Sequence, residues 1–89
     1  MSGKHLKVLW EIFAVPVRTS IQWRDIERIL IALGAEISEG NGSRVRINLN
    51  SVKAVFHRPH PRNETDKGAV VSMRRFLTAA DIVPEETFR

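Results

Sequence analysis

The 89-residue sequence contains no cysteine, so a disulfide and a thiolate-ligated metal are both excluded. No apolar run approaches the length that spans a bilayer, and the N-terminus lacks the apolar segment of a signal peptide. No acidic cluster has the spacing of metal ligands, which argues against a two-metal nuclease. Ser43 does not lie in a nucleophile elbow, so a Ser-His-Asp hydrolase is not indicated either. These absences favour a cytoplasmic protein with no metal, no small-molecule cofactor and no membrane association.

Acidic residues are also missing from one stretch, residues 40–63, although the whole chain has ten of them. This stretch contains five cationic side chains: Arg44, Arg46, Lys53, Arg58 and Arg62. Because the whole chain has a net charge of +4, the rest of it is −1, with nine Lys and Arg against ten Asp and Glu. Such a local patch indicates a phosphate-bearing ligand or an acidic partner. The alternative is an ordinary solvated strand face.

A chain of this length supports one modest core, with roughly 60–65% of the unfolded surface buried on folding. We therefore expect a single domain over residues 1–89, in which residues 1–18 form a helical extension and residues 84–89 a tail. Within the extension, apolar residues at helical spacing predict a helix over residues 5–14. Trp10 belongs to this apolar stripe, so its ring is predicted to lie in the core rather than to stack on bases.

A second helix is expected to run to about Leu33, where Gly34 stands in the position of a left-handed C-cap. Its start has two candidate caps. Thr19 forms a capping box with Gln22, and Ser20 is the alternative.

A third helix is predicted over residues 67–80, with Asp66 or Thr65 as its cap. Its inward-facing residues are expected to be Val70, Met73, Leu77 and Ala80. The same periodicity predicts that Arg74 in this helix and Glu27 in the second helix face water.

Residues 44–50 alternate strictly between polar and apolar side chains, which is typical of a strand with one face on a core and one in solvent. Asn50 and Ser51 then form a two-residue hairpin turn, because Asn tolerates the positive φ that such turns require. The segment Gly40–Gly42 forms another turn. The sequence therefore predicts a three-stranded antiparallel sheet with strands near residues 35–39, 43–49 and 52–58.

Folding on the Asn50–Ser51 turn gives three pairs on the buried face: Leu49 with Val52, Ile47 with Ala54, and Val45 with Phe56. The exposed face then carries Arg44 beside His57, Arg46 beside Val55, and Asn48 beside Lys53. The first strand is expected to pair Ile37 with Val45, Ser38 with Arg44, and Glu36 with Arg46. A sheet face that carries cations and an imidazole is the main functional signal in the sequence.

The prolines of the segment Arg58–Arg62 lack the donor that a sheet ladder needs, so this segment is predicted to be an extended, exposed loop. The apolar row of the sheet requires cover from the two longer helices. The fold class is therefore α+β, with an α-β-β-β-α order, an extra N-terminal helix, and helices packed on one face of a three-stranded antiparallel sheet. This layout resembles that of double-stranded-RNA-binding domains.

Four short motifs in this order resemble the HicA family of toxins: Leu30-Ile-Ala-Leu-Gly34, Gly42-Ser-Arg44, Pro59-His-Pro61 and Lys67-Gly68. The resemblance covers roughly residues 23–82. It implies an endonuclease that cleaves mRNA and is neutralised by a HicB-like antitoxin, which we expect to be acidic. The catalytic histidine of this family usually follows the Gly-Ser pair, and the residue in that position here is Arg44.

The chemistry must therefore come from other residues. Metal-free RNA cleavage uses the ribose 2′-OH as nucleophile and needs a base, an acid and a cation. Histidine serves as acid or base near neutral pH, which makes His57 and His60 the candidates for proton transfer. The alternatives are that His57 is an exposed strand residue without a function and that His60 has a positioning or antitoxin-contact role. Arg44 stays protonated and is predicted to bind phosphate through two nitrogens.

Two hypotheses follow. The first is a toxin that binds and cleaves mRNA. The second is a non-catalytic RNA-binding module with the same fold, which has lost cleavage together with the family histidine. In both, the predicted RNA-binding residues are Ser43, Arg44, Arg46, Lys53, Arg58, Arg62 and Lys67.

Overall fold

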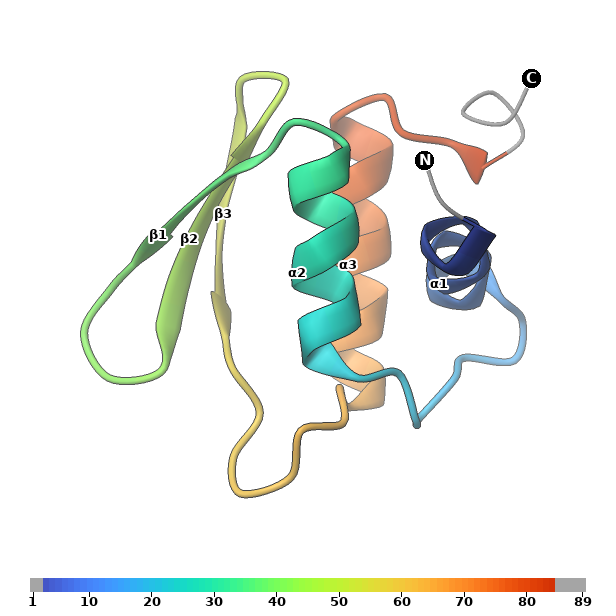
Figure 1. The fold of residues 1–89 in the computed structure, drawn as a ribbon, viewed down its shortest axis with the longest axis horizontal. Helices are drawn as coiled ribbons and strands as arrows, with labels where there is room; N and C mark the ends of the chain where they lie inside the picture. The colour runs from blue at the N-terminus through green and yellow to red at the C-terminus, as the bar shows by residue number, and fades with distance from the viewer. Residues whose placement is uncertain (1–2, 85–89) are drawn as a thin grey trace.

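In the computed structural model, which describes residues 3–84, a three-stranded antiparallel sheet is covered on one face by two helices. The elements are α1 (Gly3–Phe13), α2 (Trp23–Ala32), β1 (Glu36–Glu39), β2 (Arg44–Leu49), β3 (Val52–His57) and α3 (Lys67–Ala79). Helices α2 and α3 pack on the sheet, and α1 lies on their far side (Figure 1). Among residues 3–84, no helix covers the opposite face of the sheet, which is called the open face below. This arrangement confirms the α+β class and the α-β-β-β-α order preceded by one helix.

Residues 85–89 of the expected tail lie outside the described residues, whereas Pro84 is buried. Across residues 3–84, no helix combines the length and the apolar character that crossing a membrane requires.

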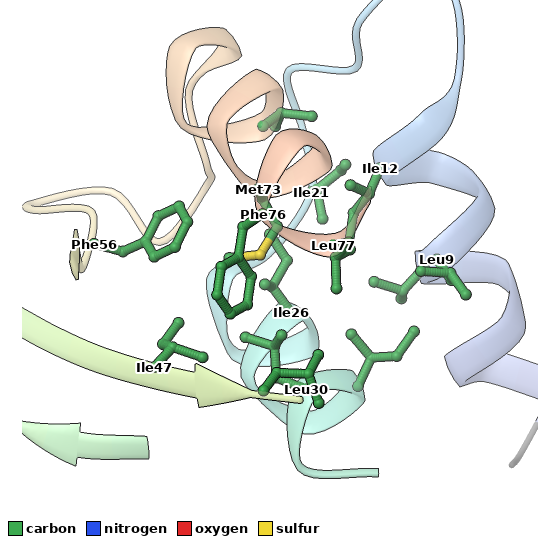
Figure 2. Close-up of a cluster of buried hydrophobic side chains, with 14 of the residues drawn as sticks. Leu9, Ile12, Ile21, Ile26, Leu30, Ile47, Phe56, Met73, Phe76 and Leu77 are labelled. Carbon is green, nitrogen blue, oxygen red and sulfur yellow. The ribbon is translucent and has the colours of Figure 1, made fainter. Parts of the chain in front are cut away.

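The core fills the space between the sheet and the helices and continues between α2, α3 and α1 (Figure 2). The sheet contributes the residues predicted from the alternation in β2, namely Val45, Ile47 and Leu49. Phe56 of β3 lies between two aromatic rings, with its centroid 6.0 Å from that of Trp23 and 5.9 Å from that of Phe76. Burial of this apolar surface is the main force that holds the helices on the sheet.

The buried face of α1 differs from the predicted one. Val8, Leu9 and Ile12 are buried, whereas Trp10 is 47% exposed, so its predicted core position is wrong. The helix sequence contains two overlapping apolar stripes that share Leu9. Contact with α2 and α3 together selects the stripe made of the shorter side chains.

Arg74 of α3 does not face open water as predicted. Its Nε donates to the carbonyl of Ile12 at 3.1 Å, and its Nη2 donates to the carbonyl of Ala14 at 2.9 Å. The last carbonyls of a helix have no partner within the helix, and a cation satisfies them well. Arg74 therefore ties the end of α1 to α3.

Helix α2 begins without either predicted cap, so the expectations for Thr19 and Ser20 are wrong. The N-cap is Gln22, which makes no side-chain capping bond. Instead, the Trp23 N–H donates to the carbonyl of Asn63 at 2.9 Å. The chain after β3 thus supplies the acceptor that a capping side chain would otherwise provide.

The C-terminus of α2 and the N-terminus of α3 have the caps predicted from the sequence. Gly34 has a φ of +97° after α2, and the Ala35 N–H donates back to the Leu30 carbonyl at 2.9 Å, which completes a Schellman motif. At the start of α3, the Asp66 side chain accepts a hydrogen bond from the Ala69 N–H at 2.8 Å. This confirms Asp66, rather than Thr65, as the cap.

The β2–β3 hairpin has the predicted register. Asn50 and Ser51 both have positive φ, at 50° and 69°, as a two-residue hairpin turn requires. All six predicted pairs are present: Arg44–His57, Val45–Phe56, Arg46–Val55, Ile47–Ala54, Asn48–Lys53 and Leu49–Val52.

The β1–β2 register is shifted by two residues from the prediction. The observed pairs are Glu36–Asn48, Ile37–Ile47, Ser38–Arg46 and Glu39–Val45. The connecting loop is longer than expected, because the Gly40 N–H donates to the Arg44 carbonyl at 2.9 Å and closes it there. A side chain at Gly40 would meet the Arg44 Cβ at 2.9 Å, so this closure needs glycine. A shift of two residues keeps the same side chains facing the core.

Candidate nucleic-acid interface

The open face of the sheet carries the cations predicted for it. Arg44 and Arg46 of β2 and Lys53 of β3 are all exposed. Between them, Val55 is 56% exposed. Arg46 and Lys53 line a shallow hollow of about 510 Å³, which Glu36 also borders. The face therefore combines positive charge with a small apolar floor.

Arg44 and His57 lie directly opposite each other at one end of this face. The Arg58 N–H donates to the Ser43 carbonyl at 2.9 Å, so Ser43 and Arg58 form a hydrogen-bonded pair of the hairpin. The next pair, Arg44–His57, is therefore a non-hydrogen-bonded pair, in which the side chains of an antiparallel ladder come closest. The geometry thus brings together a guanidinium and an imidazole, both exposed.

His57 also borders a second hollow, of about 410 Å³, between β3 and the first half of α3. Asp66 and Ser72 supply polar groups to its lining, and Phe76 lies in its wall. His57 is therefore accessible both from the open face and from the edge of the sheet.

In the loop that follows β3, residues 60–62 are exposed, as predicted, whereas Arg58 and Pro59 are half-buried, and the loop is not extended. It bends over residues 60–62, and the His60–Pro61 peptide bond is cis. His60 and Arg62 are both exposed on this loop. Lys67, the first residue of α3, is exposed as well.

Arg58 differs from the other cations because two carboxylates hold it. Its Nε and Nη2 bond the two carboxylate oxygens of Glu27 at 2.9 and 3.1 Å, and its Nη1 bonds Glu39 at 2.6 Å. The indole N–H of Trp23 also donates to Glu27. The hydrogen bond to Glu27, followed by that to Glu39, raises the pKa of Arg58 above its ordinary value. The same contact with Arg58 lowers the pKa of Glu39.

Sequence reasoning missed both acidic partners of Arg58. Glu27 was predicted to face water, yet its side chain is only 20% exposed. The Trp23–Glu27 spacing of four residues is visible in the sequence and places the two side chains on one helix face. The contact between Glu27 and Arg58 joins residues 31 positions apart in the sequence, so no local pattern predicts it.

Within residues 3–84, no three His, Cys, Asp or Glu side chains are grouped so that they could hold a metal ion.

The fold defines the class: a small α+β domain of the double-stranded-RNA-binding-domain type, with α1 added at its N-terminus. The chain belongs to the HicA family, since the family model described as the HicA toxin of bacterial toxin–antitoxin matches residues 23–82. It is therefore the toxin component of a toxin–antitoxin pair, and membership implies an antitoxin partner. Helix α1 lies outside the matched range. Searches of curated proteins and of solved structures gave no match.

Proposed function

We propose that this toxin binds mRNA on the open face of its sheet and cleaves it without a metal ion. The observation that carries the proposal is the position of Arg44 directly opposite His57, on a face that also bears Arg46 and Lys53. Cleavage at a ribose requires a base and a cation that binds the phosphate. The imidazole of His57 can supply the base, and the guanidinium of Arg44 can bind the phosphate.

In this mechanism, Arg44 binds the scissile phosphate through two nitrogens and stabilises the negative charge that develops on its oxygens. His57 takes the proton of the 2′-OH, whose oxygen attacks the phosphorus and forms a 2′,3′-cyclic phosphate. The bond to the 5′-oxygen breaks, and that oxygen must receive a proton. His60, exposed on the loop three residues further on, is the candidate acid.

Binding of the flanking nucleotides relies on the remaining predicted cations. Arg46 and Lys53 lie along the open face, Arg62 on the loop and Lys67 at the start of α3. Their contacts with phosphate supply affinity without sequence preference. Ser43, exposed in the loop before β2, is proposed to contribute its hydroxyl as a further phosphate contact.

The antitoxin partner is proposed to be a HicB-like protein with an acidic surface that covers the same sheet face. A cationic face attracts such a partner and speeds its association. An antitoxin in this position excludes RNA directly.

A non-catalytic RNA-binding module remains the second candidate. One specific observation favours it: position 44, where the family usually carries its catalytic histidine, is arginine, which cannot act as a base at neutral pH.

The experiment that separates the two uses purified protein and labelled RNA in the presence of EDTA. Cleavage with a cyclic-phosphate product supports the ribonuclease. Retarded migration of intact RNA supports the binding module, and a protein that neither binds nor cleaves RNA contradicts both.

A further inference from the structure

The two carboxylates that hold Arg58 differ in burial and in geometry. Glu27 lies on α2, is 20% exposed, and binds two guanidinium nitrogens while also accepting the indole N–H of Trp23. Glu39 lies at the end of β1, is 66% exposed, and reaches only Nη1. Glu27 is therefore a fixed support for the guanidinium, and Glu39 is a surface partner.

The ion pair between Arg58 and Glu39 is weak enough for another anion to displace the Glu39 carboxylate. An ion pair with an exposed carboxylate contributes little to stability, because water and salt compete for both charges. A phosphate oxygen of RNA fits the same guanidinium nitrogen, and a phosphodiester carries the same single negative charge as the carboxylate. Glu27 keeps Arg58 in place during such an exchange, so no side chain must be reordered.

Arg58 also lies in the right part of the molecule for this exchange. Its N–H is bonded to the Ser43 carbonyl, and the next pair of the hairpin is Arg44–His57. Successive side chains along a strand point to opposite faces, so the guanidinium lies at the same end of the hairpin as the proposed catalytic pair but on the helix-covered side, where it meets Glu27 of α2. The Arg58 side chain is 34% exposed at this end.

We infer that Arg58 is a preformed phosphate-binding residue whose guanidinium is bound by Glu39 in the free protein, and that a phosphate of an RNA strand passing around this end of the hairpin displaces the Glu39 carboxylate. The inference rests on the proposed function, since it names a phosphate contact of that same site. Glu39 thus competes with RNA, and the exchange makes the affinity for RNA lower than the cationic face alone would give.

The test measures binding of a fluorescent RNA oligonucleotide that is 2′-O-methylated throughout, so that cleavage cannot occur. We expect Glu39→Gln to bind about three- to fivefold more tightly than the wild type, since an exposed ion pair opposes displacement by no more than that. Glu11→Gln is the matched control. It removes the same charge from α1, which lies on the far side of α2 and α3 from the sheet, and among residues 3–84 no ion pair involves Glu11. Its effect is expected to stay below about twofold, through long-range charge alone.

Two further variants separate competition at Arg58 from simple repulsion of RNA. In an Arg58→Gln background, Glu39→Gln is expected to have no more effect than Glu11→Gln. Glu27→Gln is expected to weaken binding, because it removes the support of the guanidinium rather than its competitor. Thermal unfolding of each variant confirms that the protein is folded at the assay temperature.

Each outcome bears on a different claim. Equal effects of Glu39→Gln and Glu11→Gln, or tighter binding by Glu27→Gln, overturn the assignment of Arg58 and Glu39 while leaving RNA binding established. Absence of any RNA affinity in the wild type overturns the proposed function and this inference with it. A larger effect of Glu39→Gln that disappears without Arg58 supports the exchange.

Discussion

Arg44 and His57 face each other across the β2–β3 ladder as a non-hydrogen-bonded pair on the open face of the sheet. A two-residue turn at Asn50–Ser51 sets this pairing, so the relative position of the two side chains is built into a single hairpin. The proposed chemistry depends on that hairpin more than on any other element.

The first prediction concerns His57. His57→Ala is expected to lower cleavage by at least ~100-fold, because a positioned acid or base contributes about that much or more, while affinity for RNA stays nearly unchanged. Gel analysis of labelled RNA in EDTA measures the rate, and fluorescence anisotropy measures binding. His5→Ala, on α1, is the control for loss of an imidazole elsewhere. Cleavage at the wild-type rate by His57→Ala would contradict the mechanism and make His60 the next residue to test.

The second prediction concerns Arg44. Arg44→Ala is expected to reduce both RNA affinity and cleavage, the rate by roughly 100-fold, since one charge-stabilising donor is lost. Arg44→Lys is expected to restore affinity better than rate, because lysine keeps the charge but loses the planar pair of donors. Arg44→His is expected to raise the rate if a base at this position is all that is missing. Equal recovery of rate and affinity by Arg44→Lys would argue against two-nitrogen binding of the phosphate.

The third prediction concerns the docking face. Reversing two charges together, Arg46→Glu and Lys53→Glu, is expected to weaken binding of RNA by more than about tenfold and also to weaken binding of the antitoxin. Arg24→Glu with Arg75→Glu is the control, because both residues are exposed on the helices that cover the opposite face. Isothermal titration measures both partners. If antitoxin affinity survives the reversal unchanged, the antitoxin docks elsewhere, for example on α3.

The fourth prediction tests whether α1 is an integral part of the fold. Ile12 is fully buried in α1, and Ile31 is 62% exposed in α2. Ile12→Ala is expected to lower the free energy of unfolding by about 2–5 kcal/mol, through lost burial and the cavity left behind. Ile31→Ala makes the same chemical change at a surface position and is expected to lower it by less than about 1 kcal/mol. Urea titration measures both. A small effect at Ile12 would mean that α1 contributes little to the stability of the domain.

The fifth prediction concerns pH. The hydrogen bond from Arg58 lowers the pKa of Glu39 from its ordinary value of 4.5. The contribution of this ion pair to stability is therefore complete above that ordinary value, and it is lost as the pH falls through the lowered pKa. The free energy of unfolding of the wild type should exceed that of Glu39→Gln at pH 6, and the difference should shrink as the pH is lowered further below 4.5. Glu36→Gln, measured in the same urea titrations, should show no such loss. If the difference in unfolding free energy persists in acid, the effect of Glu39 on stability does not come from its charge.

Several parts of the fold follow from the sequence alone. The alternation of β2 identifies its buried face, and Asn50–Ser51 fixes the register of the hairpin, because a two-residue turn leaves one pairing. Gly34 and Asp66 mark their helix ends through local hydrogen bonds. These features depend on neighbours within a few residues, so local chemistry decides them. The opposition of Arg44 and His57 belongs to this group. Their roles, and that of His60, stay predictions.

Only the tertiary structure decided the rest. Trp10 and Val8 lie on competing stripes of α1, and the choice between them depends on the helices against which α1 packs. The start of α2 takes its hydrogen bond from Asn63 rather than from a neighbouring cap. Arg58 contacts Glu27, which lies 31 residues away in the sequence. The sequence alone therefore gives no sign that this arginine forms an ion pair. Periodicity shows which residues share a face, but the partner of that face is set by packing between distant segments, and no local pattern encodes it.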